Sequence, residues 1–294
     1  MQLVNKIKKS WKDYRKNHSI QQFVFSIILY FILFLCALVV FLPCLYAIAT
    51  SFKDELEVLD ENVTLFSKNP ILDNYKHILN NPYVPIFTWF LNSIKVSVTY
   101  VLGYLLIASL ASYAFARLRF KGREVIFWIC MSSMMIPGVI NMIPHYIIVD
   151  KLRLVDTFLA MVVPGLGGVG GMFMMRQFMK GVPMAYDEAA RIDGANELDI
   201  YLRVVLPMCV PVLVTQAIFC FQGSWNDYTW PLIVTNSDAS RTLTAGFATF
   251  SGSYAHEYGK QMAGSVLSAL PIMVIFLIGQ KYFIKGISIG GIKG

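Results

Sequence analysis

Long apolar runs separated by polar segments recur along most of this chain. A helix needs about 20 mostly apolar residues to cross about 30 Å of hydrocarbon, because each residue advances it by about 1.5 Å. The pattern predicts an all-α polytopic membrane protein with six transmembrane helices in a membrane domain at 23–294, after a basic N-terminal segment at 1–22. The predicted spans run approximately over 23–49, 90–116, 125–149, 157–175, 204–222 and 262–283.

Glycines and prolines interrupt the fourth and fifth predicted spans. Such breaks persist in a bilayer only where neighbouring helices or water satisfy the freed backbone groups, which favours a packed bundle over isolated anchors. Gly167 and Gly171 have the small-xxx-small spacing that permits close helix packing. The stretch at 165–170 also matches the dinucleotide motif G-x-G-x-x-G, but no strand precedes it, so the packing interpretation is favoured.

Composition supports the membrane assignment. Of the 294 residues, 56% are hydrophobic and only 15% are charged, and this leaves too little polar surface to cover a soluble core. The first apolar run is too long for a signal peptide, and no small-residue cleavage site follows it, so it is expected to be a retained span. The five cysteines lie in apolar stretches without paired spacing, so neither a metal site nor a disulfide framework is expected.

The distribution of basic residues predicts the orientation. Most of the 25 lysines and arginines fall in segments that lie inside if the N-terminus is inside, and positive loops resist translocation. Both termini are therefore expected on the cytoplasmic side. The net charge of +7 then reflects topology, and an inner face that meets anionic lipid explains it better than nucleic-acid binding does.

Two predicted outer segments are long, at 51–89 and 224–261. The first is polar and punctuated by prolines, and it reads as an irregular exposed cap. The second mixes aromatic with polar residues, which suits either a partner or sugar surface or an interfacial aromatic belt. Its aromatic residues are Trp225, Tyr228, Trp230, Phe247, Phe250, Tyr254 and Tyr258.

The segment at 182–203, between the fourth and fifth predicted spans, predicts two short helices. Pro183 can open the first, Asp187 and Glu188 suit its positive first turn, and Gly194 supplies a left-handed residue that ends it. Asn196 can cap the second. An interfacial helix on lipid headgroups is the alternative, but anionic lipid would repel the acidic residues of the segment.

This segment resembles the EAA signature of ABC-importer permeases, Glu-Ala-Ala-x3-Gly-x9-Ile-x-Leu-Pro, with valine at 204 in place of isoleucine. In that family the loop docks into a cleft of the ATP-binding subunit and transmits its closure to the membrane helices. The resemblance implies an ATPase-coupling loop. The residues that it assigns to coupling are Glu188, Ala189, Ala190, Asp193, Gly194, Leu206 and Pro207.

The resemblance extends from about residue 23 to the end of the chain. The segments at 92–96, 114–123, 134–138, 143–144, 225–231 and 290–294 look like those of carbohydrate importer permeases of the maltose-type second subunit. This implies a bacterial or archaeal plasma membrane, a second homologous permease, two ABC ATPase subunits and an extracellular solute-binding protein. The substrate that it implies is a carbohydrate, and we expect an oligosaccharide.

The chain is expected to catalyse no covalent chemistry. It has no G-x-x-x-x-G-K-[ST] loop, so ATP and Mg²⁺ are expected in the partner ATPase and no cofactor is expected in this chain. Polar residues within spans are costly and often functional, although for each residue taken alone a hydrogen bond to a neighbouring helix is the favoured interpretation. The candidates for the substrate path are Asn141, His145, Gln216, Gln222, Trp225 and Asn226.

Other classes fit less well. A secondary transporter would need a coupling-ion or proton site, and the predicted spans contain almost no acidic residues. A membrane-embedded enzyme would need clustered polar groups, but the four histidines are scattered over different segments. An importer permease for a non-sugar solute stays open, because the docking signature is shared among importers of different solutes.

Overall fold

The computed structural model describes residues 20–62, 64–82, 84–253 and 257–291 of the chain. Within these ranges the secondary structure is helical and contains no strand, which confirms the predicted all-α class. Among the described residues, three single helices are long and apolar enough to cross a membrane. They are α2 (Ile20–Ser51), α5 (Ile86–Arg117) and α16 (Tyr258–Gly291).

Three further candidate spans are pairs of helices with a bend between them. The bend is 94° in the first pair, 48° in the second and 78° in the third. The six-span count holds only if each bent pair crosses once, so it stays a prediction. The first pair comprises α6 (Arg123–Ser132) with η1 (Ser133–Met135), and η2 (Gly138–Asn141) with α7 (Met142–Lys151). The second comprises α8 (Phe158–Val162) with η3 (Val163–Gly165), and α9 (Val169–Gly181). The third comprises α11 (Glu197–Asp199), η4 (Ile200–Val205) and α12 (Leu206–Met208), followed by α13 (Val210–Asn226).

The bends coincide with prolines and glycines. Pro137 separates η1 from η2, and Gly168 directly precedes α9. Pro207 and Pro211 flank the third bend, where the backbone turns at Cys209. Proline lacks an N–H group and glycine costs backbone entropy, so a continuous helix is disfavoured at these points. The straight helix in the region of the fifth predicted span accordingly begins at Val210, six residues after the predicted start.

The segment at 51–89 is more regular than the irregular cap that its composition indicated. It contains α3 (Glu55–Val58) and α4 (Asp73–Asn80). The Asn74 side-chain amide donates hydrogen bonds to the carbonyls of Ser51 and Lys53, at 3.0 and 2.8 Å. Ile78 on the same helix is fully buried. These contacts fix α4 to the end of α2.

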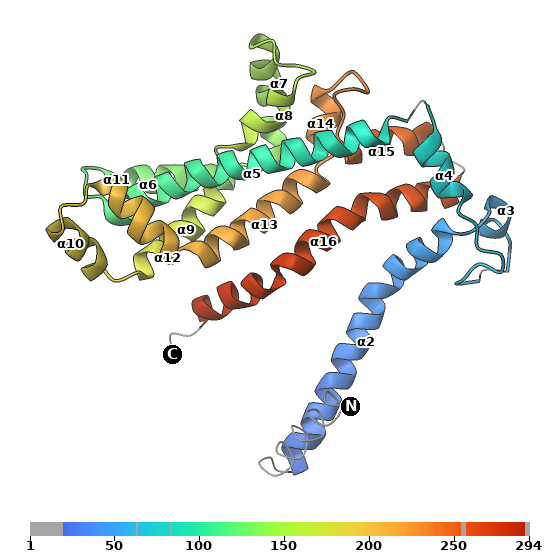
Figure 1. Ribbon diagram of the computed structural model, residues 1–294, viewed down its shortest axis with the longest axis horizontal. Coiled ribbons are helices and arrows are strands. Elements are labelled where there is room, and N and C mark those ends of the chain that lie inside the picture. The colour runs from blue at the N-terminus through green and yellow to red at the C-terminus, as the bar shows by residue number, and fades with distance from the viewer. Residues whose placement is uncertain (1–19, 63, 83, 254–256, 292–294) are drawn as a thin grey trace.

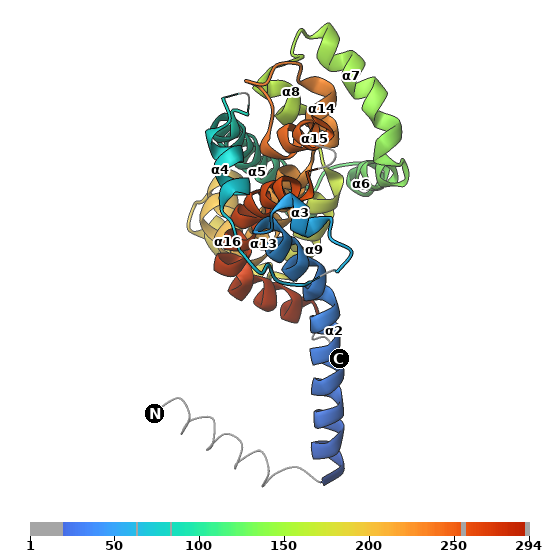
Figure 2. The same ribbon diagram turned by 90° about the vertical axis from the view of Figure 1, so that its right-hand side faces the viewer.

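The helices form an elongated bundle along α5 (Figure 1). α9 and α13 pack against α5, and α16 packs against α13 and α2. α10 (Ala185–Ile192) and α11 lie at one end of the bundle, here called the α10 end, whereas α4 and α15 (Leu243–Ser253) lie at the opposite end, called the α15 end. α14 (Thr229–Val234) also lies toward the α15 end. α2 projects away from the bundle, and its most apolar window has no buried residue (Figure 2).

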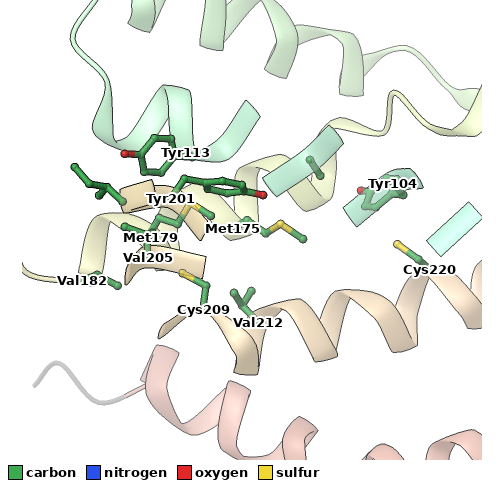
Figure 3. Close-up of a cluster of buried hydrophobic side chains, with 12 residues drawn as sticks. Tyr104, Tyr113, Met175, Met179, Val182, Tyr201, Val205, Cys209, Val212 and Cys220 are labelled. Atoms are coloured by element: carbon green, nitrogen blue, oxygen red, sulfur yellow. The ribbon is translucent and has the colours of Figure 1, made fainter. Parts of the chain in front are cut away.

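Two apolar clusters hold the two ends of the bundle. At the α10 end, side chains from α5, α9, η4 and α13 interlock (Figure 3). Met175, Ile200, Val205 and Cys209 in this cluster are fully buried. We call Met175, Ile200, Val205, Cys209 and the other side chains of this cluster the α10-end core. The second cluster, near the α15 end, is aromatic and includes Trp89, Trp225, Phe247 and Phe250.

Close packing of α9 on α5 depends on two glycines. A Cβ atom at Gly171 would lie 2.5 Å from the Tyr104 hydroxyl, and one at Gly168 would lie 2.4 Å from the Tyr104 ring. A Cβ at Gly167 would meet nothing within 4 Å. The packing role predicted for Gly171 is confirmed, but the one predicted for Gly167 is wrong, because the bend before α9 turns Gly168 toward Tyr104 instead.

Candidate functional site

The loop at 182–203 folds locally much as its sequence indicates. α10 carries Asp187 and Glu188 in its first turn, and Gly194 adopts a left-handed conformation with φ = 85°. The Asn196 side chain accepts a hydrogen bond from the backbone N–H of Asp199 at 2.9 Å, and so caps α11. Pro183 precedes the helix, which begins at Ala185. The two short helices therefore project from the α10 end as a compact unit.

The EAA-like residues divide between the surface of this unit and its packed side. Ala190 and Leu206 are half-buried and pack against the α10-end core. The others, including Glu188 and Ala189, are exposed. Ile192, on the same short helix, is 86% exposed. The unit thus presents acidic and apolar groups side by side, which suits contact with a protein surface better than contact with anionic lipid. The remaining exposed members of the set are Asp193, Gly194 and Pro207.

A buried ion pair ties α10 to α5. The Arg117 Nε atom, in the last residue of α5, lies 3.6 Å from Asp187 Oδ2, and both side chains are almost completely buried. The guanidinium also donates to the carbonyl of Val182 at 2.8 Å and contacts the Met184 sulfur at 2.7 Å. Arg117 therefore contacts both the residues that directly precede α10 and the first turn of α10. The EAA-like signature does not include either member of this pair.

A second tie lies one helical turn earlier on α5. The Tyr113 hydroxyl donates a hydrogen bond to Glu197 Oε2 at 2.8 Å. The other carboxylate oxygen of Glu197 accepts two hydrogen bonds from Arg191, at 3.0 and 2.8 Å. Since Arg191 lies in α10 and Glu197 in α11, this network closes the turn at Gly194 and joins it to α5.

A cavity of about 650 Å³ lies between the helices, lined by residues of α5, α7, α9, α13 and α14. His145 and Trp230 approach each other there edge to face, with ring centroids 6.2 Å apart. The indole N–H of Trp230 donates to the carbonyl of Ala160 at 2.9 Å, which fixes the ring. Aromatic rings and hydrogen-bonding groups both line this cavity. The aromatic and polar lining residues include Tyr100, Tyr104, His145, Gln216, Ser224, Asp227 and Trp230.

Asp227 is the carboxylate in this lining. It follows α13 directly, and its Oδ1 accepts hydrogen bonds from the backbone N–H groups of Thr229 and Trp230, at 3.1 and 3.2 Å. Burial raises the pKa of Asp227 above its ordinary value, in spite of these two donors. The carboxylate thus caps the start of α14 and borders the cavity at the same time.

The structure separates the six substrate-path candidates. His145 and Gln216 line the cavity, and the Gln216 amide contacts the Met174 sulfur at 2.9 Å. Trp225 belongs to the aromatic cluster near the α15 end and donates to the carbonyl of Ser268 at 3.0 Å. The other three candidates lie outside the cavity lining. They are Asn141, Gln222 and Asn226.

Sequence reasoning did not single out Tyr100 and Tyr104 as lining residues, because tyrosines within an apolar helix give no distinctive pattern.

The aromatic residues of 224–261 differ in burial. Trp225, Phe247 and Phe250 are buried, whereas Tyr228 and Tyr258 are exposed. Tyr254 lies outside the described residues. The surface and belt interpretations of this segment therefore apply only to its exposed rings. Among the described residues, no group of three His, Cys, Asp or Glu side chains could hold a metal ion.

Comparisons with known proteins match this architecture. The family described as binding-protein-dependent transport system inner membrane component matches residues 103–289. The arabinooligosaccharides transport system permease protein AraQ of Halalkalibacterium halodurans is 36% identical over 95% of this chain and 99% of its own length. The lactose transport system permease protein LacG of Rhizobium radiobacter is 28% identical over 91% of this chain and 96% of its own length. A crystal structure of a bacterial ABC transporter involved in the import of alginate contains a chain with a TM-score of 0.79 and 24% identity, covering 90% of this chain and 99% of that chain.

Proposed function

Because the chain belongs to the family of binding-protein-dependent transport system inner membrane components, we propose that it is the membrane-spanning permease subunit of an ATP-driven carbohydrate importer. The observation that carries the proposal is the combination of this membership with an exposed loop at the α10 end, which one ion pair joins to α5 and another holds across its own turn. The chain itself moves solute and hydrolyses nothing.

In this proposal, the 182–203 loop docks on an ATPase subunit. Glu188, Ala189 and Gly194 form the coupling core, together with the other residues of the EAA-like set. Ala189 permits close approach, and Gly194 sets the turn between α10 and α11. ATP and Mg²⁺ bind in the ATPase. Closure of its subunits moves α10 and switches the bundle between inward-open and outward-open states.

A carbohydrate substrate is supported by the printed roles of the relatives and by the cavity. The two named relatives transport arabino-oligosaccharides and lactose. Aromatic faces with nearby hydrogen-bonding groups, such as Trp230 beside His145, suit the apolar and hydroxyl faces of a sugar ring. His145 and Gln216 are the members of the sequence-predicted path that we place in contact with substrate.

The proposed complex contains a second homologous permease, two ATPase subunits and an extracellular solute-binding protein. It lies in a bacterial or archaeal plasma membrane, with both termini and the α10 end on the cytoplasmic side. The α15 end, with its exposed rings at Tyr228 and Tyr258, then faces the binding protein. The apolar surface of α2 contacts lipid or the second permease.

The test is purification of the tagged chain from its native membranes, with mass spectrometry of its companions and reconstitution in proteoliposomes. We expect a second permease and an ATPase to copurify, and labelled oligosaccharide to enter the vesicles only with ATP and a sugar-loaded binding protein. Labelled glutamine and histidine are the control solutes. Uptake of an amino acid but not of sugars would replace the carbohydrate assignment, and uptake without ATP would overturn the importer assignment.

A further inference from the structure

The helix α5 is attached to both ends of the molecule through polar side chains. At the α10 end, three of its residues hold the loop that we propose to dock on the ATPase. Arg117 contacts Asp187 and Tyr113 contacts Glu197, as described above. Ser109 shares a hydrogen bond of 2.7 Å with the Tyr201 hydroxyl. Positions 109, 113 and 117 recur every four residues, so they form one stripe on the helix.

At the α15 end, the first turns of α5 hold the segment between α14 and α15. The Trp89 indole N–H donates to the carbonyl of Asp238 at 2.8 Å. The Asn92 amide donates to the carbonyls of Ala239 and Arg241, at 2.7 and 3.0 Å. The Ser93 hydroxyl accepts from the backbone N–H of Leu243 at 2.7 Å.

All of these partners are backbone groups of the 238–243 segment. Side chains of α5 therefore fix the path of that segment whatever its own side chains are. Trp89 and Ser93 are also buried, so the attachment is shielded from solvent. A displacement of this segment must move α5 or break four hydrogen bonds.

Between these attachments α5 is continuous. Its 32 residues extend about 48 Å, at about 1.5 Å per residue, and contain no proline. The other two single long helices each contain one, at Pro43 in α2 and Pro271 in α16. The three remaining candidate spans are bent. Among the described helices, α5 is thus the best suited to carry a displacement over the length of the bundle.

We propose that α5 is the rigid link between the two faces of the permease. Arg117 and Tyr113 act as positioning residues that join it to the docking loop, and Asn92 and Ser93 join it to the 238–243 segment. Engagement of a binding protein at the α15 end then changes the position of α10 on the ATPase, and the effect is reciprocal. This inference rests on the proposed function.

The experiment is an ATPase assay of the full importer complex in proteoliposomes, with and without sugar-loaded binding protein. The readout is the ratio of stimulated to unstimulated rates. Asn92→Ala removes two hydrogen bonds at one end of α5, and Tyr113→Phe removes one at the other. We expect each change to lower the ratio about fivefold or more while the complex still assembles. Ser93→Ala is a second, smaller change at the α15 end.

The double variant Asn92→Ala/Tyr113→Phe makes the test specific. The two positions are about 32 Å apart along the helix, and effects at such distances normally multiply. If both act through one rigid link, the double variant loses no more stimulation than the more severe single variant. Tyr75→Phe is the matched control, because it removes a tyrosine hydroxyl bond of 2.7 Å to Ser51 of α2 and no hydrogen bond to α5.

Losses that multiply in the double variant would overturn the link through α5, as would equal loss in Tyr75→Phe or unchanged ratios in both single variants. A parent complex that no sugar-loaded binding protein stimulates would overturn the proposed function, and with it the link that rests on it. A parent complex that is stimulated keeps the proposed function, so the variants then test the link alone.

Discussion

The Tyr104 hydroxyl on α5 accepts a hydrogen bond of 2.9 Å from the backbone N–H of Gly171 on α9. The first N–H groups of a helix have no partner within the helix, and this tyrosine satisfies one of them inside the bundle. The ring fills the space in which side chains at Gly168 and Gly171 would lie. One tyrosine and two glycines thus set the separation of α5 and α9, next to the central cavity.

Gly171→Ala is therefore expected to destabilise the protein. The new methyl group would lie 2.5 Å from the Tyr104 oxygen, and overpacking of this kind costs about 1–3 kcal/mol. Thermal unfolding of the purified complex measures the change. Gly170→Ala is the control on the same helix, because its nearest neighbour lies at 3.7 Å and alanine favours a helix by about 1 kcal/mol over glycine. Equal melting temperatures in the two variants would contradict the packing role of Tyr104.

Interactions between residues close together in the sequence could be predicted, whereas contacts between distant residues could not. Gly194 and Asn196 act on residues within three positions, so their conformation and capping could be predicted from local chemistry. Arg117 and Asp187 are 70 positions apart, and no periodicity indicates that they meet. Helix direction decides such contacts, and the bends in three candidate spans redirect the helices in ways that composition does not predict.

Sequence alone also could not predict which of the substrate-path candidates face the cavity. A polar residue in an apolar helix is conspicuous in sequence, but whether it faces a cavity depends on the rotation of the helix. Gln216 faces the cavity, whereas Gln222, six residues later on α13, is exposed outside the lining. Trp225 in the same helix turns into the aromatic cluster instead.

A change at Gly194 tests the turn between α10 and α11, which we propose to dock on the ATPase. Its φ of 85° is strained for residues with a Cβ, yet open space surrounds it within this chain, so any effect on the chain's own fold comes from backbone conformation. We expect Gly194→Val to reduce ATP-driven uptake severely, because a β-branched residue costs about 1–2 kcal/mol or more in this conformation. Gly194→Asn is the matched variant, since asparagine tolerates it. Equal loss in both variants would show that the absence of a side chain, and not the backbone angle, is what the site requires.

The cavity is tested with two glutamines of α13. Gln216→Ala removes a hydrogen-bonding group from the cavity, and a lost hydrogen bond to substrate is worth about 1 kcal/mol. We expect the kcat/KM of sugar uptake to fall about fivefold. Gln222→Ala deletes the same amide outside the lining and is expected to leave uptake near the parent value. Transport kinetics in proteoliposomes measure both, and a larger effect at Gln222 would move the substrate path away from this cavity.

Low pH is expected to loosen the α15 end through Asp156. Its Oδ1 accepts hydrogen bonds from the backbone N–H groups of Asn236 and Ser237, at 2.9 and 3.1 Å. Burial alone would raise the pKa of Asp156, but these bonds and those from the Ser237 and Ser240 side chains together hold it below the ordinary 3.8. A lowered pKa in the folded protein means that the carboxylate stabilises the fold fully above pH 3.8, and that this contribution is lost as the pH falls through the folded value.

Hydrogen–deuterium exchange of the peptide that contains Asn236 and Ser237, corrected for intrinsic rates, measures this effect. Protection in the parent is expected to hold from pH 7 to pH 5 and to fall below pH 4. Asp156→Asn is the informative variant, because Asp156 has φ = 61° and asparagine accepts that conformation, so the backbone angle is kept while the negative charge and one acceptor oxygen are removed. We expect its protection to be lower at pH 7 and nearly flat as the pH falls. A parallel decline in parent and variant would assign the acid sensitivity of the segment to another carboxylate, because a neutral amide at 156 cannot titrate in this range.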